Sequence, residues 1–120
     1  MLVGGSQLAR LRRKADFERL VRQGRFGSVG PVSVRVCANE AGQVRVGLAV
    51  SRRLGKAVVR NRVRRRLREA VRAELEGIPG SVDLLITARP GSVEATFGEL
   101  RRALRDALKR AGAWRTSQPR

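Results

Sequence analysis

Basic side chains are concentrated in one stretch of this 120-residue chain, between Ser51 and Arg72. The stretch holds ten Lys or Arg residues and a single acid, Glu69. Guanidinium groups donate several hydrogen bonds from a planar fork, so this composition is best suited to binding a phosphate polyanion. The basic residues are Arg52, Arg53, Lys56, Arg60, Arg62, Arg64, Arg65, Arg66, Arg68 and Arg72.

A helix in the second half of this stretch would position these side chains. Apolar residues recur there at spacings of three and four, which is typical of one buried helix face. They are Val59, Val63, Leu67, Ala70, Val71 and Leu75. At about 100° per residue, the opposite side collects Asn61, Arg64, Arg65, Arg68 and Arg72. The helix is expected to end near residues 76 and 77.

Like charges four residues apart argue against an ordinary solvated face, which mixes both signs. Arg60, Arg64, Arg68 and Arg72 form three such pairs in succession, and each pair costs an isolated helix about 0.2–0.5 kcal/mol. We therefore expect an anionic partner, which is RNA, DNA or an acidic membrane surface. The membrane is the least favoured, because the apolar face lacks the Trp or Phe that would seat it in a bilayer interface.

The acidic residues form no catalytic pattern. The chain has no His, and its ten carboxylates are scattered along the sequence. A metal-dependent nuclease needs carboxylates that converge on its cations, and the sequence has no Cys/His metal spacing and no phosphate-binding Gly-rich loop. We therefore assign no catalytic and no metal-binding residue, and we do not expect the chain to cut RNA unaided.

Length and composition indicate one globular domain, with its core over about residues 8–112 and flexible ends. Hydrophobic residues make up 42% of the chain, which excludes a disordered basic tail. The net charge of +17 favours nucleic-acid binding. The single Cys37 excludes an intrachain disulfide and fits a reducing compartment. The sequence shows no signal peptide and no membrane-spanning run, so we expect a cytoplasmic protein.

The N-terminal part predicts a short helix and a loop. Asp16 is expected to cap this helix, Phe17 and Val21 fall on its apolar face, and Gly24 ends it. Residues 25–31 are expected to form a loop that holds at most one very short strand.

Alternating apolar and polar residues predict two strands after this loop, over residues 32–38 and 44–50. The turn signal at residues 39–42 predicts that the two strands pair as a hairpin. Arg35 and Arg45 fall on the polar phase of the alternation. The open face of the sheet is therefore expected to be basic.

The C-terminal third predicts a buried strand and a final helix. Residues 82–88 are mostly apolar, as in a central strand covered on both faces. Thr96 and Glu99 form a capping box before an apolar stripe that ends at Gly112. Because a helix between two strands makes a crossover, the order of elements predicts an α+β fold with a mixed sheet covered by helices. Ordinary rules make this crossover right-handed.

The basic helix and the loop before it resemble the signature of a known family. Gly55-Lys56-Ala57-Val58 precedes Arg60-Asn61-Arg62-Val63-Arg64-Arg65 and Leu67-Arg68-Glu69, and this two-part pattern is similar to the signature helix of the protein subunit of bacterial ribonuclease P. The N-terminal part of the chain has basic residues before Asp16-Phe17 and a helix end at Gly24. This arrangement is similar to the N-terminal part of the family's sequences. The resemblance covers nearly all of residues 8–110.

The resemblance implies a fold, an activity and partners. The fold is an α-β-β-(β)-α-β-α sandwich like domain 2 of ribosomal protein S5, with a rare left-handed βαβ crossover. The activity is endonucleolytic removal of the 5′ leader from precursor tRNA by the ribonuclease P holoenzyme. In this family the RNA subunit and the substrate phosphates hold the catalytic Mg²⁺, and the protein assists. The implied partners are the RNA subunit and precursor tRNA, with no membrane and no small-molecule substrate.

The resemblance also implies which side chains contact which RNA. The basic helix and its preceding loop would dock on the RNA subunit through Arg52, Arg53, Lys56, Arg60, Asn61, Arg62, Arg64, Arg65, Arg68 and Arg72. A groove between the first helix and the exposed sheet face would hold the single-stranded leader, in contact with Phe17, Arg13, Lys14, Arg35 and Arg45. Phe17 either stacks on a leader base, which is worth roughly 1–3 kcal/mol, or belongs to the core.

Family members often have aromatic residues at the positions of Val21 and Arg35, and this chain has none there. Arg35 would still be able to stack through its guanidinium plane.

Three other functions stay open on the residues alone. A ribosomal-type RNA-binding module of the same fold explains the charge and the helix equally well. A DNA-binding protein would need varied base-reading side chains or a dimer interface, whereas nearly uniform Arg suits phosphates and RNA shape. A stand-alone nuclease is disfavoured because the acid–base groups it requires are missing.

Overall fold

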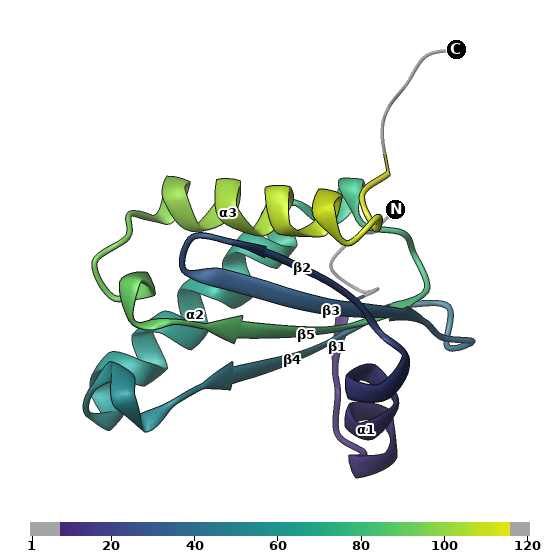
Figure 1. Ribbon diagram of the computed structural model, residues 1–120, viewed down its shortest axis with the longest axis horizontal. Helices are drawn as coiled ribbons and strands as arrows, with labels where there is room; N and C mark the ends of the chain where they lie inside the picture. Colours follow the sequence, from purple (N-terminus) through teal and green to yellow (C-terminus); the bar gives the residue numbers. More distant parts are fainter. Residues whose placement is uncertain (1–7, 116–120) are drawn as a thin grey trace.

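The computed structural model describes residues 8–115, which form a five-stranded sheet with helices on both faces (Figure 1). The strands follow the order β1-β4-β5-β3-β2 across the sheet. In chain order the elements are β1 (Leu8–Arg10), α1 (Lys14–Gln23), β2 (Arg25–Val29), β3 (Val32–Ala38), β4 (Val44–Val50), α2 (Ala57–Ala73), β5 (Val82–Ala88) and α3 (Phe97–Arg110).

The sheet is mixed, as the order of elements predicts. β5 lies at its centre, parallel to β4 and antiparallel to β3, while β1 pairs in parallel with the outer side of β4. α2 is the crossover between the parallel strands β4 and β5. The α+β fold class is therefore confirmed, and the left-handed sense of the crossover stays a prediction.

The hairpin predicted between β3 and β4 is wrong. β5 lies between these two strands, and β3 instead forms a hairpin with β2. Alternation and a turn signal describe each strand locally, but they do not say which strand it pairs with. β2 itself lies in the segment predicted as a loop, where Gly27 interrupts the alternation. Gly27 is glycine because a side chain there would strike the Ala107 carbonyl of α3.

The N-terminal boundaries also differ from the prediction. α1 begins at Lys14 with Arg13 as its N-cap, and Asp16 lies inside the first turn, facing arginines rather than the helix end. β1 was not predicted, because three residues are too few to show alternation. Gly24 ends α1 as predicted. α2 ends at Ala73, a few residues earlier than its pattern suggests, because a separate helical turn follows.

The two faces of the sheet are covered unequally. α2 and α3 pack together on one face, whereas α1 lies on the other face and covers only one end of it (Figure 1). Alternate residues of β3 and β5, such as Val34 and Leu84, are fully buried under α2 and α3. The opposite phase of the same strands forms the open face, part of which α1 leaves uncovered.

The C-terminal helix follows its sequence signal closely. The predicted capping box is confirmed, since the backbone N–H of Glu99 donates to Thr96 Oγ1 and the N–H of Thr96 donates to Glu99 Oε1. Gly112 follows the helix with a φ of +74°. Ala113 is buried and Trp114 packs over Gly77, so the packed part of the chain extends to Trp114. Within residues 8–115, no helix is long and apolar enough to cross a membrane.

Candidate RNA interface

α2 exposes its arginines along one side, as the sequence pattern predicts. Its apolar stripe is buried, with Val63 1% and Leu67 0% exposed. Among residues 8–115, none of the ten basic residues between positions 52 and 72 forms an ion pair with a carboxylate. We define the arginine surface as these basic residues other than Arg66, together with Asn61. Its positive charge is not compensated within the described chain.

Hydrogen bonds inside the arginine surface hold some of its side chains in place. Arg64 Nη1 donates to Asn61 Oδ1 at 2.7 Å, and Arg60 Nε donates to the Gly55 carbonyl at 3.2 Å. Arg66 points elsewhere, because its Nη1 donates to the Ala95 carbonyl at 3.1 Å. This contact explains why Arg66, although part of the basic run, does not belong to the surface.

The loop before α2 presents the remaining basic residues. Residues Arg52–Leu54 form one turn of 3₁₀ helix, in which Ser51 Oγ accepts a hydrogen bond from the Arg53 N–H at 3.0 Å. Leu54 is buried and anchors the turn, while Arg52 and Arg53 remain exposed. Gly55 then has a φ of +136°, which other residues rarely adopt. Arg52 and Arg53 precede the N-terminus of α2, which is the positive end of the helix dipole.

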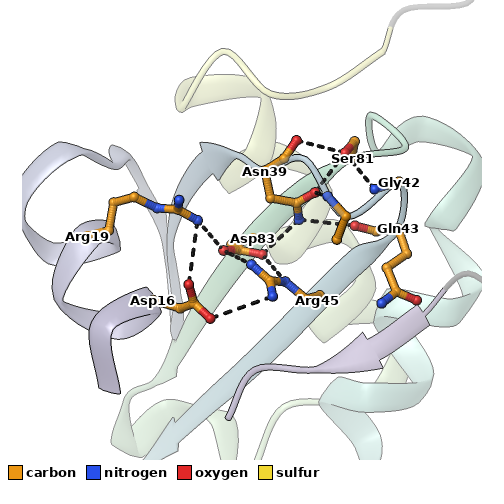
Figure 2. Close-up of polar contacts among 9 residues, drawn as sticks. Asp16, Arg19, Asn39, Gly42, Gln43, Arg45, Ser81 and Asp83 are labelled. Carbon is orange, nitrogen blue, oxygen red and sulfur yellow. Dashed lines mark hydrogen bonds and ion pairs between the residues drawn. The ribbon is translucent and has the colours of Figure 1, made fainter. Parts of the chain in front are cut away.

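A buried carboxylate fastens α1 to the sheet (Figure 2). Asp83 of β5 is 0% exposed and points to the face that carries α1. It accepts hydrogen bonds from Arg45 Nε at 2.7 Å, Arg45 Nη2 at 2.9 Å, Arg19 Nη2 at 2.7 Å and Asn39 Nδ2 at 2.8 Å. Asp16 lies farther from the two guanidinium groups, at 3.8 Å and 3.6 Å. One side chain thereby joins α1, β4 and the turn after β3.

The ionisation of this cluster follows from its contacts. Burial alone would raise the pKa of Asp83, but hydrogen bonds from Arg45 and Asn39 and the nearby guanidinium charges hold that pKa below its ordinary value. The hydrogen bond to Asp83 in turn raises the pKa of Arg19 and of Arg45. Asp83, Arg19 and Arg45 are therefore all charged at neutral pH.

Arg45, which the resemblance assigns to the leader, lies in this cluster, and its contact with the leader stays a prediction. Its guanidinium is bonded to Asp83 and its side chain is 23% exposed, so most of its charge is compensated. The sequence contains a signal for this pairing, namely a lone acid within the apolar run of residues 82–88. Such an acid needs a cationic partner when the strand is buried.

The open sheet face beside α1 carries the other residues assigned to the leader. The Phe17 ring packs on Gly47, where a Cβ atom would lie only 2.7 Å from Phe17 Cε1, and Phe17 remains half-buried. It is therefore both a packing residue and a surface residue. Val21 is 59% exposed on the same helix. Arg35 projects from β3, and Arg13 and Lys14 are exposed at the start of α1.

A cavity at the β1–β4 edge of the sheet connects this face with the arginine surface. Its volume is about 440 Å³. Phe17 lines one side of it, Arg64, Arg68 and Arg72 of α2 line another, and apolar residues such as Leu48 line the rest. Phe17 of the leader set and three arginines of the arginine surface, although far apart in sequence, therefore line one cavity.

The second buried carboxylate, that of Glu74, also forms ion pairs with arginines. Glu74 accepts hydrogen bonds from Arg101 Nε at 2.7 Å and Arg105 Nε at 3.0 Å, which ties the end of α2 to α3. Burial tends to raise the pKa of Glu74, but these two guanidinium groups bring it below its ordinary value. Within residues 8–115, no three His, Cys, Asp or Glu side chains gather as they would around a metal ion.

Fold and surface together define an α+β protein with an uncompensated basic surface within residues 8–115, of the kind that suits a nucleic acid. The family model for ribonuclease P matches residues 6–112, which is most of the chain. The chain belongs to the ribonuclease P protein family. This membership makes it a subunit of ribonuclease P and implies an RNA partner.

Individual relatives agree with the family match. The chain is 41% identical over 107 residues to the ribonuclease P protein component of a Nocardioides species, covering 87% of this chain and 92% of the relative. It is 39% identical over 104 residues to the protein component of Symbiobacterium thermophilum, covering 86% and 90%.

Solved structures confirm the fold. The ribonuclease P protein of Staphylococcus aureus superposes with a TM-score of 0.77 at 30% identity, covering 88% of this chain and 96% of that one. The Thermotoga maritima protein gives a TM-score of 0.75 at 30% identity, covering 84% and 96%. A further S. aureus structure, with a TM-score of 0.77 at 27% identity and covering 91% of each chain, is of a mutant described as defective in mRNA degradation activity.

Proposed function

We propose that this chain binds the ribonuclease P RNA subunit through the arginine surface and holds the 5′ leader of precursor tRNA on the open sheet face beside α1. In this way it assists endonucleolytic removal of the leader. The observation that carries the proposal is the uncompensated charge of the arginine surface within residues 8–115, joined to the open face by the edge cavity.

Docking on the RNA subunit follows from this charge. Each phosphate that an Arg neutralises releases condensed counterions, so affinity should fall steeply with salt concentration. The arginines lie along three turns of one rigid helix, which suits the shape of an RNA backbone better than the sequence of its bases. Asn61 supports this role by holding the Arg64 guanidinium through the 2.7 Å hydrogen bond.

Leader binding follows from the open face. A single strand is held without sequence preference by aromatic rings that stack on bases and by cations that follow the backbone. Phe17 supplies a half-buried ring, and Arg13, Lys14 and Arg35 supply cations around α1. Arg45 contributes indirectly, because its bond to Asp83 helps to fix α1 on the sheet.

Catalysis belongs to the RNA subunit in this proposal, and Mg²⁺ is held mainly by that RNA and by the substrate phosphates. The two buried carboxylates of residues 8–115, Asp83 and Glu74, do not suit a cation, because both already accept hydrogen bonds from arginines. The arginine surface would instead reduce repulsion between the phosphates of the two RNAs. Less free Mg²⁺ should then be needed.

Cleavage of precursor tRNA at low Mg²⁺ by a bacterial ribonuclease P RNA, with and without this chain, tests the proposal. We expect site-specific 5′ maturation only when both components are present. If the chain binds the RNA without activating it, a ribosomal-type RNA-binding function replaces the proposal.

A second candidate function is mRNA degradation, because one similar S. aureus structure is of a mutant described as defective in mRNA degradation activity. In that case the purified chain would degrade RNA in Mg²⁺ without any RNA subunit. Activity that scales with protein concentration and persists through repurification would move the chemistry from the RNA to the protein.

A further inference from the structure

An exposed aromatic side chain on the open sheet face has no role in the function proposed so far. Phe26 of β2 is 50% exposed, and within residues 8–115 no other large apolar side chain of the strands is exposed. Its cross-strand neighbour in the β2–β3 hairpin is Arg35. The Arg35 guanidinium carbon lies 5.1 Å from the centroid of the Phe26 ring, which is within the range of a cation–π contact.

Phe26 and Phe17 mark the two ends of one row across the sheet. Gly47 of β4 is opposite Leu85 of β5, Leu85 is opposite Arg35 of β3, and Arg35 is opposite Phe26. Phe17 covers the Gly47 end of this row. Three steps of about 4.8 Å between strands separate the two ends by about 14 Å.

The composition of this row suits single-stranded RNA. It offers two rings, the apolar side chain of Leu85 and the Arg35 guanidinium, with no carboxylate among its members. Arg35 forms no ion pair within residues 8–115. Aromatic rings beside an uncompensated cation are the usual platform on which successive bases stack.

We propose that Phe26 and Arg35 form a second stacking platform for the leader, which receives a different base from the one at Phe17. This inference rests on the proposed leader binding and adds to it the place and length of the bound strand. With stacked bases about 3.4 Å apart, a span of about 14 Å corresponds to about four nucleotides, and to fewer when the strand is extended. The ring of Phe26 thus supplies an aromatic group on a face where Val21 and Arg35 supply none.

Leader length provides the test. Holoenzyme reconstituted with a bacterial ribonuclease P RNA is titrated with precursor tRNAs whose leaders range from one to ten nucleotides. Wild-type affinity should increase in two steps as the lengthening leader reaches first one ring and then the other. Phe26→Ala should remove one of the steps, with a loss of roughly fivefold or more in affinity for leaders long enough to reach Phe26. Phe17→Ala should remove the other step.

A scan with abasic leader nucleotides locates the platform. One abasic position, about two to four nucleotides away from the position sensitive to Phe17→Ala, should weaken binding to wild type but not to Phe26→Ala. Phe26→Leu is the control, because it keeps an apolar side chain of similar size but no ring. It should behave as Phe26→Ala if stacking is the cause, and circular dichroism should show all variants folded.

The outcomes separate this inference from the proposed function. If wild-type affinity does not depend on leader length at all, leader binding itself is wrong. If wild type shows both steps and Phe26→Ala retains them, only the second platform is wrong. An equal loss of affinity for leaders of every length would also overturn the inference, because it would show that Phe26 acts through the fold.

Discussion

Replacing Asp83 by Asn should detach α1 from the sheet. The substitution keeps the size of the side chain but removes its charge, and it places an NH₂ donor among guanidinium and amide donors. Asp83 accepts four hydrogen bonds from Arg45, Arg19 and Asn39, and three of these bonds come from charged groups. No other side chain in Figure 2 can accept all of them, since Asp16 lies beyond hydrogen-bond distance.

The loss of stability can be estimated from these contacts. Breaking a buried ion pair by removing one partner is worth about 3–5 kcal/mol. The side chains of Arg19 and Arg45 are 36% and 23% exposed, so water can solvate the guanidinium groups that lose their acceptor. We therefore expect Asp83→Asn to lower the free energy of unfolding by about 3 kcal/mol, at the lower end of that range.

Urea denaturation at neutral pH, followed by circular dichroism and extrapolated linearly, measures this difference. Asp16→Asn is the matched control, because it makes the same chemical change in the same cluster. Its contacts are longer and only partly buried, so the control should lose less than about 1 kcal/mol. The reasoning is refuted if Asp83→Asn is no less stable than Asp16→Asn.

Three further predictions follow from the packing. The pKa of Asp83 is lower in the folded than in the unfolded protein, so the ionised carboxylate stabilises the fold at neutral pH and this stabilisation is lost in acid. Wild type should therefore lose stability below about pH 4, and acid titration of Asp83→Asn should show a smaller loss. Gly47→Ala should push the Phe17 ring outward, and a leader-length titration should then show weaker binding even if the melting temperature changes little. Gly77→Ala should displace Trp114, which a red shift of tryptophan fluorescence would report, and an unchanged spectrum would contradict the packing.

The local features of the fold were predictable from the sequence. The arginine surface depends on a 3.6-residue period, and the period places Leu67 inside and Arg65 outside without reference to any other element. The Thr96–Glu99 capping box is likewise confined to four residues. Residue type and spacing are sufficient for such features, because the interacting groups are neighbours along the chain.

Features that depend on distant segments were not predictable in the same way. Alternation identified β3 and β4 but could not show that β5 separates them. It also placed Arg45 on the open face without revealing Asp83, 38 residues away, as its partner. The segment of β2 was predicted as a loop with at most one very short strand, because the packing of Gly27 under α3 is revealed only by the assembled fold.

The central claim is that the arginine surface docks on the RNA subunit, and the affinity of that assembly tests it most directly. The double variant Arg64→Glu/Arg68→Glu should lose assembly with a bacterial ribonuclease P RNA and should show a shallower salt dependence. Arg102→Glu/Arg110→Glu on α3 changes the net charge equally at exposed positions and should assemble nearly as wild type does. If both double variants weaken assembly to the same extent, or if the α2 variant assembles as wild type does while remaining folded, the docking surface lies elsewhere.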